Sequence, residues 1–131
     1  MIAMLGALQA EMYQPRMRIA GAESSWWAGR ELYQGTLGTQ AVLCTWTGAG
    51  IAQAALTAQH VCSCFNPEII LFGGIGAALN PVYELGDIVI AEDVIQWDMD
   101  TSAIGGGVGV FPGLQNDSQW ARELPTNLTL R

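Results

Sequence analysis

Two unbroken apolar runs on either side of a glycine-rich turn constrain the fold of this 131-residue chain most strongly. The first run covers residues 69–72 and the second residues 88–90, and three glycines lie within residues 73–76. Apolar runs without alternation are typical of strands that are covered on both faces in α/β sheets. Open α/β sheets place their ligands at the carboxyl ends of such strands, where glycines permit close approach. We therefore expect a ligand pocket directly after the first run.

The rest of the chain predicts an α/β domain with a mixed central β-sheet flanked by helices. Short turns at Ala28-Gly29 and Gly38-Thr39 separate strand-like segments and indicate an antiparallel meander. Pro15 is expected to break the first helix, and Asn66-Pro67 to end the second. Expected strands lie near residues 2–5, 24–27, 30–37, 41–47, 68–72 and 87–95, and expected helices over residues 8–20 and 52–64.

Composition excludes several classes of partner. Twelve acidic residues stand against five arginines, which gives a net charge of −7. Binding of DNA or RNA needs a basic surface, so we expect no nucleic acid partner. No apolar run approaches the ~18 residues of a membrane-spanning helix, so we expect no membrane partner. Three cysteines, an odd number, favour a reducing compartment, and the expected location is the cytoplasm.

One glycine motif imitates a dinucleotide-binding fingerprint. Residues 74–79 read GIGAAL, and Asp93 follows at about the distance of a ribose-binding acid. The fingerprint requires a helix whose N-terminus meets the pyrophosphate. Asn80-Pro81 would end that helix at once, so we expect no nucleotide cofactor.

Two clusters suggest a metal ion, but neither supplies enough ligands. On a helix, His60 and Cys64 share a face while Cys62 points away, and two ligands do not close a zinc site. Asp98 and Asp100 form an acidic pair, yet acids after a strand can equally cap a turn. We expect no metal.

Glu11 is the best candidate for catalysis. It follows the glycine turn of the first strand, at the edge where Gly48–Gly50 and Gly73-Gly74 follow other strands. A carboxylate beside two loops of backbone donors is well placed to act as a general base on water. The alternative is a structural acid at a helix N-terminus, where the helix dipole favours negative charge.

Several longer motifs occur in a fixed order. They read IAMLGALQAEM, ELYQGTLG, TWTGAGIAQAA, NPEIILFGGIGAAL, ELGDIVIAEDVIQWDMD and FPG. Together they resemble the first half of the purine nucleoside phosphorylase/nucleosidase superfamily, and most closely its methylthioadenosine/S-adenosylhomocysteine nucleosidase branch. The resemblance covers residues 1–113 and leaves residues 114–131 as a polar tail. It implies a phosphorylase/hydrolase-like fold and hydrolysis of the N-glycosidic bond of a purine nucleoside, in methionine salvage.

The resemblance also assigns residues to roles. Glu11 matches the catalytic glutamate that positions or deprotonates the attacking water. Ala49 falls in the loop beside the ribose and water, and Ile75, Gly76 and Ala77 fall on the loop that lines the purine and ribose pocket. The family usually has a serine in place of Ile75.

Further matches concern a neighbouring subunit. Asp98 and Asp100 match an element near the family's dimer interface, with Trp97 in place of a histidine. Ile104 and Pro112 match positions that reach into the pocket of the other subunit. We therefore expect a homodimer formed around residues 95–112.

The chain departs from the family mainly in length. The family's second half carries a Met-Glu pair that holds the ribose hydroxyls and an aspartate that protonates purine N7, and residues 114–131 resemble neither. The resemblance therefore implies a truncated domain that is incomplete for catalysis. The alternatives are a nucleoside phosphorylase, or a non-catalytic remnant that binds nucleosides.

Overall fold

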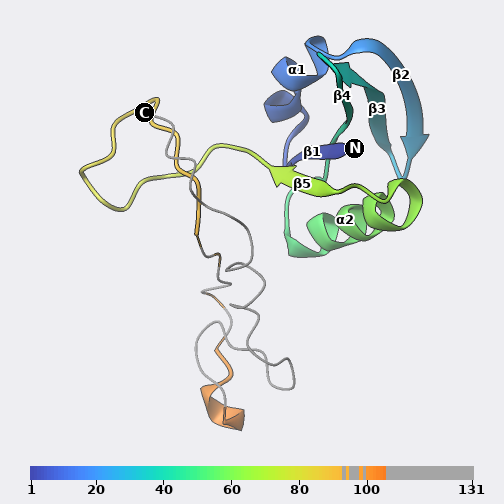
Figure 1. The fold of residues 1–131 in the computed structure, drawn as a ribbon. Coiled ribbons are helices and arrows are strands. Elements are labelled where there is room, and N and C mark those ends of the chain that lie inside the picture. Colours follow the sequence, from blue (N-terminus) through green and yellow to red (C-terminus); the bar gives the residue numbers. More distant parts are fainter. Residues whose placement is uncertain (93, 95–97, 99, 106–131) are drawn as a thin grey trace. The chain divides into compact units, whose positions relative to one another are not determined.

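The computed structural model describes residues 1–92, 94, 98 and 100–105, which fall into two units divided after Ala77. The first unit contains five strands and two α-helices (Figure 1). In chain order these are β1 (Ile2–Gly6), α1 (Gln9–Met17), β2 (Ala20–Trp27), β3 (Arg30–Leu37), β4 (Gln40–Trp46), α2 (Ile51–Phe65) and β5 (Ile69–Phe72). The described part of the second unit contains a short 3₁₀-helix, η1 (Ser102–Ile104).

The five strands form one mixed sheet, as the sequence predicted. Its order is β2-β3-β4-β1-β5. Strand β1 pairs in parallel with β4 on one side and with β5 on the other, whereas β2, β3 and β4 form an antiparallel meander. The carboxyl ends of β4, β1 and β5 therefore lie side by side at one edge of the sheet.

The two helices cover opposite faces of this sheet (Figure 1). Alternate residues of a strand point to opposite faces, and β4 shows this directly. Leu43 belongs to the cluster under α2, whereas Val42 and Cys44 belong to the cluster under α1. The α2 cluster consists of Ala3, Leu5, Leu32, Leu43 and Val61, and the α1 cluster of Met12, Ile19, Tyr33, Val42 and Cys44.

Both predicted hairpin turns are present. Ala28 and Gly29 have φ values of 47° and 76°, and a two-residue turn with positive φ at both positions matches the right-handed twist of its strands. Strand β2 begins at Ala20, earlier than expected, and its pairing is irregular between Ala20 and Glu23. The prediction missed this start because exposed small and polar residues there show no strand alternation.

The predicted break in the first helix and the predicted strand at residues 87–95 were wrong. Helix α1 runs through Pro15 and ends at Met17, so proline falls in its last turn, where only one hydrogen bond is lost. The predicted strand at residues 87–95 is not observed in its described residues, 87–92 and 94. The side chains of the apolar run Ile88–Ile90 are exposed. Apolar side chains alone do not make a strand, because a strand also needs a neighbour that pairs with its backbone N–H and C=O groups.

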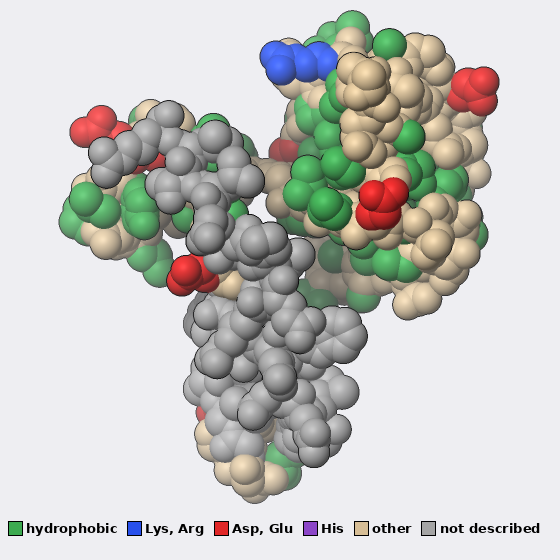
Figure 2. All heavy atoms as spheres, in the orientation of Figure 1, with side chains coloured by type: hydrophobic (Ala, Val, Ile, Leu, Met, Phe, Trp, Pro, Cys, Tyr) green, Lys and Arg blue, Asp and Glu red, His purple; other side chains and the backbone are tan. Residues whose placement is uncertain are grey.

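The expected burial of β5 was also wrong. Its four side chains are 36–57% exposed, because β5 is an edge strand with a neighbour on one side only. Figure 2 shows hydrophobic side chains spread over the visible surface of the first unit. This unit therefore exposes an apolar edge of the kind that favours association.

A buried arginine joins three elements of the first unit. Arg30 is only 7% exposed. Its Nε donates to the carbonyl of Thr47 at 2.8 Å, and its Nη1 to the carbonyl of Ala28 at 2.9 Å. Its Nη2 donates to Oε1 of Gln53 on α2. The guanidinium thus ties the β2–β3 turn to the end of β4 and to α2.

We expect Arg30→Met to lower the free energy of unfolding by about 2–4 kcal/mol, because it removes three charge-assisted hydrogen bonds, one of them to the buried carbonyl of Thr47. Urea denaturation followed by circular dichroism measures this. Arg18→Met, at the exposed end of α1, is the matched control and should change stability by less than about 0.5 kcal/mol. Equal losses in the two variants would contradict this role of Arg30.

Candidate active site

Three loops are joined where β1, β4 and β5 end. The backbone N–H of Thr47 donates to Gly6 at 2.7 Å, and that of Gly48 donates to Ala7 at 3.0 Å. On the other side, the N–H of Gly73 donates to the carbonyl of Leu5 at 2.9 Å. These bonds continue the parallel pairing past the strand ends. The loops after the three strands therefore start next to one another, as expected from the sequence.

Glu11 links the first of these loops to the third. It lies in the first turn of α1, and its Oε2 accepts a bond from the N–H of Leu8 at 2.8 Å. Its Oε1 accepts a bond from the N–H of Ile75 at 3.2 Å, across 64 residues of sequence. The bond to Leu8 fits the interpretation as a helix N-terminal acid. The bond to Ile75 adds what a catalytic interpretation requires, a carboxylate held at the carboxyl edge of the sheet.

Gly74 makes room for this carboxylate. A Cβ atom at position 74 would lie 2.7 Å from Oε1 of Glu11 and 3.1 Å from its Cδ. A Cβ at Gly76, by contrast, would meet nothing within 4 Å. The sequence shows three similar glycines, and the structure identifies Gly74 as the one that permits the close approach.

Backbone donors also set the charge of the site. They lower the pKa of Glu11 below its ordinary value of 4.5, the bond from Leu8 contributing most and the bond from Ile75 next. Glu11 is therefore ionised at neutral pH. Such a carboxylate is a strong acceptor for a water molecule, but a weak base until the surroundings change. Orienting water is the chemistry that this geometry supports.

The other predicted substrate-binding residues lie in the loops after β4 and β5. Ala49 is exposed in the loop after β4. Ile75, Gly76 and Ala77 are exposed in the loop after β5, and the Ile75 side chain is 89% exposed. The bond to Glu11 comes from the backbone N–H of Ile75, so it does not need a particular side chain at this position.

The predicted interface residues lie in the second unit. Ile104 is 72% exposed in η1, while Trp97 and Pro112 lie outside the described residues. Oδ1 of Asp100 accepts bonds from the N–H and the hydroxyl of Ser102 at 2.9 and 2.5 Å. These bonds lower the pKa of Asp100, the hydroxyl bond contributing most. Asp100 thus accepts bonds at the turn that leads into η1, in line with the alternative that this acid caps a turn.

The described residues offer little to a metal or a nucleotide cofactor. Among the described residues, no group of three or more histidine, cysteine, aspartate or glutamate side chains could hold a metal ion. Sγ of Cys64 lies 3.5 Å from Nδ1 of His60, as the helical spacing predicted, and these are two ligands only. Residues 77–92, all of them described, contain no helix after the glycines of the motif at residues 74–79. Within the described part of the chain, no helix is long and apolar enough to cross a membrane.

Sequence reasoning missed one charged group beside the second loop. A Cβ at Gly48 would lie 3.5 Å from Nη2 of Arg30, so the buried guanidinium lies directly against this glycine. No short motif signals the contact, because 17 residues separate Arg30 from the carbonyl of Thr47 that it binds.

Comparison with known proteins relates the sequence of this chain to one family. The sequence model of the phosphorylase superfamily matches residues 2–127. The chain is 34% identical over 113 residues to the 5'-methylthioadenosine/S-adenosylhomocysteine nucleosidase of Geobacillus kaustophilus, covering 86% of this chain and 48% of that protein. It is 28% identical over 124 residues to the nucleosidase of the same name from Staphylococcus haemolyticus, covering 95% and 54%. The chain thus spans about half the length of these curated relatives.

Solved structures agree in fold. The methylthioadenosine/S-adenosylhomocysteine nucleosidase of Colwellia psychrerythraea, solved in complex with adenine, superposes with a TM-score of 0.81 at 26% identity, covering 85% of this chain and 46% of that one. Futalosine hydrolase of Helicobacter pylori gives a TM-score of 0.80 at 22% identity, covering 86% and 49%. The arrangement of β1 to β5 is therefore the arrangement of these neighbours.

Gly74→Ala should raise the pKa of Glu11 toward its ordinary value, because the added methyl group displaces the carboxylate from the N–H of Ile75. Carbon-13 NMR of the Glu11 carboxyl during an acid titration measures this shift. Gly76→Ala is the matched control, since its methyl group meets no atom within 4 Å. An unchanged Glu11 pKa in Gly74→Ala would show that the close approach does not hold the carboxylate.

Proposed function

Because this chain belongs to the phosphorylase superfamily, we propose that it contributes to a nucleosidase, which hydrolyses the N-glycosidic bond of a purine nucleoside of the methylthioadenosine or S-adenosylhomocysteine type. The observation that carries the proposal is the ionised Glu11, held between the loops after β1 and β5. A relative that is 34% identical to this chain over 113 aligned residues bears the name of that activity.

In the proposed reaction Glu11 orients one water molecule. The water oxygen bonds to the anomeric carbon of the ribose while the bond from that carbon to the purine nitrogen breaks. The electron pair of the broken bond stays with the purine, which takes up a proton from a general acid other than Glu11, and Glu11 accepts a proton of the water. Ala49 and residues 75–77 are proposed to line the ribose and purine, since they are the exposed positions of the adjoining loops.

The charges near Glu11 favour water over phosphate as the nucleophile. A phosphorylase must hold a phosphate dianion with basic groups. Arg30 is the basic group beside the second loop, but it is buried and donates to Thr47, Ala28 and Gln53. Arg16 lies over the ring of Tyr33 instead of reaching the loops. The negative charge of Glu11 would also repel phosphate.

Nucleoside phosphorylase stays the second candidate because of one observation. The guanidinium of Arg30 lies 3.5 Å from the point where a Cβ of Gly48 would stand, close to a loop of the site. Arginine has five N–H donors, and three atoms of this one are already engaged. Phosphate dependence of the reaction separates the two candidates.

We further propose that residues 1–131 alone do not complete the site. Release of a purine needs an acid on the leaving base, and Glu11 is the one carboxylate bound among the three loops in the described part of the chain. The relatives are about twice as long, which supports a contribution from a second half or from the other subunit of a homodimer. The proposed setting is nucleoside metabolism and methionine salvage in the cytoplasm.

The test of catalysis joins residues 1–113 to the second half of the Geobacillus kaustophilus nucleosidase. This chimera should release adenine from methylthioadenosine without phosphate, and Glu11→Gln should slow release by about 10²–10⁴-fold. Glu23→Gln, an exposed carboxylate of β2, is the control and should leave the rate unchanged. Release that requires phosphate would identify a phosphorylase, and equal rates for the two variants would indicate a non-catalytic remnant.

The 131-residue chain by itself should release adenine at least about 10²-fold more slowly than the chimera, because it lacks acid assistance to the leaving base. Chromatography of the products measures both rates at equal protein concentration. Robust release by the isolated chain that Glu11→Gln abolishes would show that these residues, alone or as a dimer, complete the site.

A further inference from the structure

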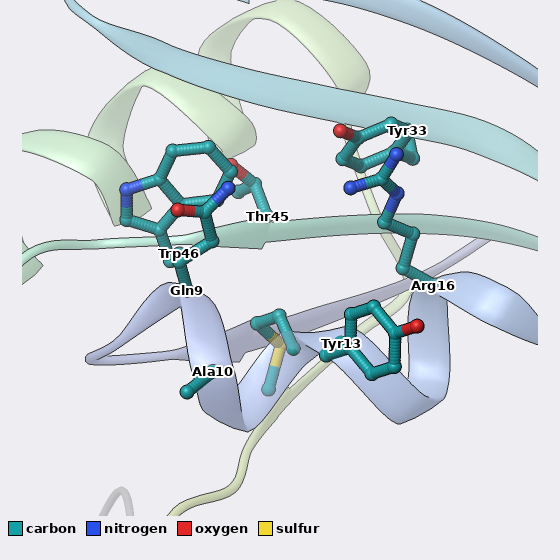
Figure 3. A pocket seen from close by; sticks show the side chains of 8 residues that line it. Gln9, Ala10, Tyr13, Arg16, Tyr33, Thr45 and Trp46 are labelled. Atoms are coloured by element: carbon teal, nitrogen blue, oxygen red, sulfur yellow. The ribbon is translucent and has the colours of Figure 1, made fainter.

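A cavity of about 580 Å³ opens between α1 and the sheet, on the face opposite α2 (Figure 3). From α1 it is lined by Gln9, Tyr13 and Arg16, and from the strands by Tyr33 and Trp46. Its volume lies in the range of pockets that bind small organic molecules. Nothing in the proposed reaction uses it.

This cavity is separate from the Glu11 site. Its walls include neither Glu11 nor the loop of Gly74 and Ile75. Residues 9, 13 and 16 recur at the spacing that brings helix side chains to one face. The Glu11 carboxylate, by contrast, is turned to the N–H groups of Leu8 and Ile75. One short helix therefore borders two different sites.

The cavity carries the positive charge of Arg16, which forms no salt bridge with an acid of the described residues. Arg16 places its guanidinium carbon 4.2 Å from the centroid of the Tyr33 ring. The salt bridge found within the described part of the chain joins the N-terminus to Glu68 and leaves Arg16 without a carboxylate within 4.0 Å. Figure 3 shows the guanidinium stacked on Tyr33 at one end of the cavity. Arginine in such a position favours a carboxylate ligand, which it can bind in a planar, bidentate manner.

Aromatic rings form the rest of the wall. Tyr33 is 5% exposed, and its hydroxyl donates to a carboxylate oxygen of Glu31, which fixes the ring. Burial, helped by this bond, raises the pKa of Tyr33 to about 12, so the ring stays neutral beside Arg16. Trp46 and Gln9 lie together at the other end of the cavity, and Tyr13 lies on the side of α1 (Figure 3). Aromatic faces of this kind stack on planar rings, and the Gln9 amide adds a polar contact.

We propose that this cavity is a second ligand site, which binds a small planar aromatic molecule that carries a carboxylate. The aromatic part stacks on the ring of Trp46, and the carboxylate accepts hydrogen bonds from Arg16, which is itself held on the ring of Tyr33.

Isothermal titration calorimetry with 2-naphthoate tests this site, and 2-naphthamide serves as the uncharged probe of the same shape. Naphthoate should bind with a Kd of about 1 mM or tighter, and about tenfold more tightly than naphthamide. Arg16→Gln should remove this difference. Arg18→Gln, an exposed arginine two residues further on that does not line the cavity, should change the Kd less than about twofold.

A second pair of variants tests the aromatic wall. Trp46→Leu should weaken both probes, whereas Trp26→Leu, 69% exposed on β2, should weaken neither. Circular dichroism confirms that each variant is folded. No measurable binding of naphthoate, equal binding of the two probes, or equal effects of Arg16→Gln and Arg18→Gln would each overturn the proposal. Binding that none of the four variants alters would place the probes on the exposed apolar surface instead.

Discussion

The parallel pairing of β1 on both of its sides is the interaction on which the rest of the structure depends. It sets the carboxyl ends of β4, β1 and β5 at one edge, and the loops that follow are then joined by backbone bonds. None of the three loop segments, residues 7–8, 47–50 and 73–77, carries a charged side chain. Glu11 supplies it because α1 begins directly after β1, which leaves the side chain within reach of the third loop.

Much of this arrangement could be predicted from the sequence, because its signals are local. Apolar runs, glycine turns and helix formers identify β1, β3, β4, α2 and β5 within a few residues, and their order places Glu11 at the right edge. Local signals failed where a partner distant in sequence decides the outcome. Residues 88–90 are apolar enough for a strand, but their side chains are exposed. Arg30 is buried, and the carbonyl of Thr47 that its side chain binds lies 17 residues away in the sequence.

In the candidate site, too, the sequence indicates the types of residue but not all of their contacts. The sequence shows which residues can do chemistry, so Glu11 could be singled out among twelve acids. It could not show that Gly74, rather than its neighbours, accommodates the carboxylate, because three glycines in a row of four look equivalent. Nor could it show the Arg16 cavity, which needs α1 to be packed across β3 and β4.

The bond from Ile75 to Glu11 has a consequence for the order of events on the ribosome. Its partners are 64 residues apart, and β5 is the last strand to join the sheet along the chain. Contacts between distant residues form late, since the loop between them must close first. The carboxylate therefore gains its second donor only after nearly the whole first unit has emerged and α2 has crossed the sheet. A nascent chain shorter than this has a helix with an acid near its start, but no site.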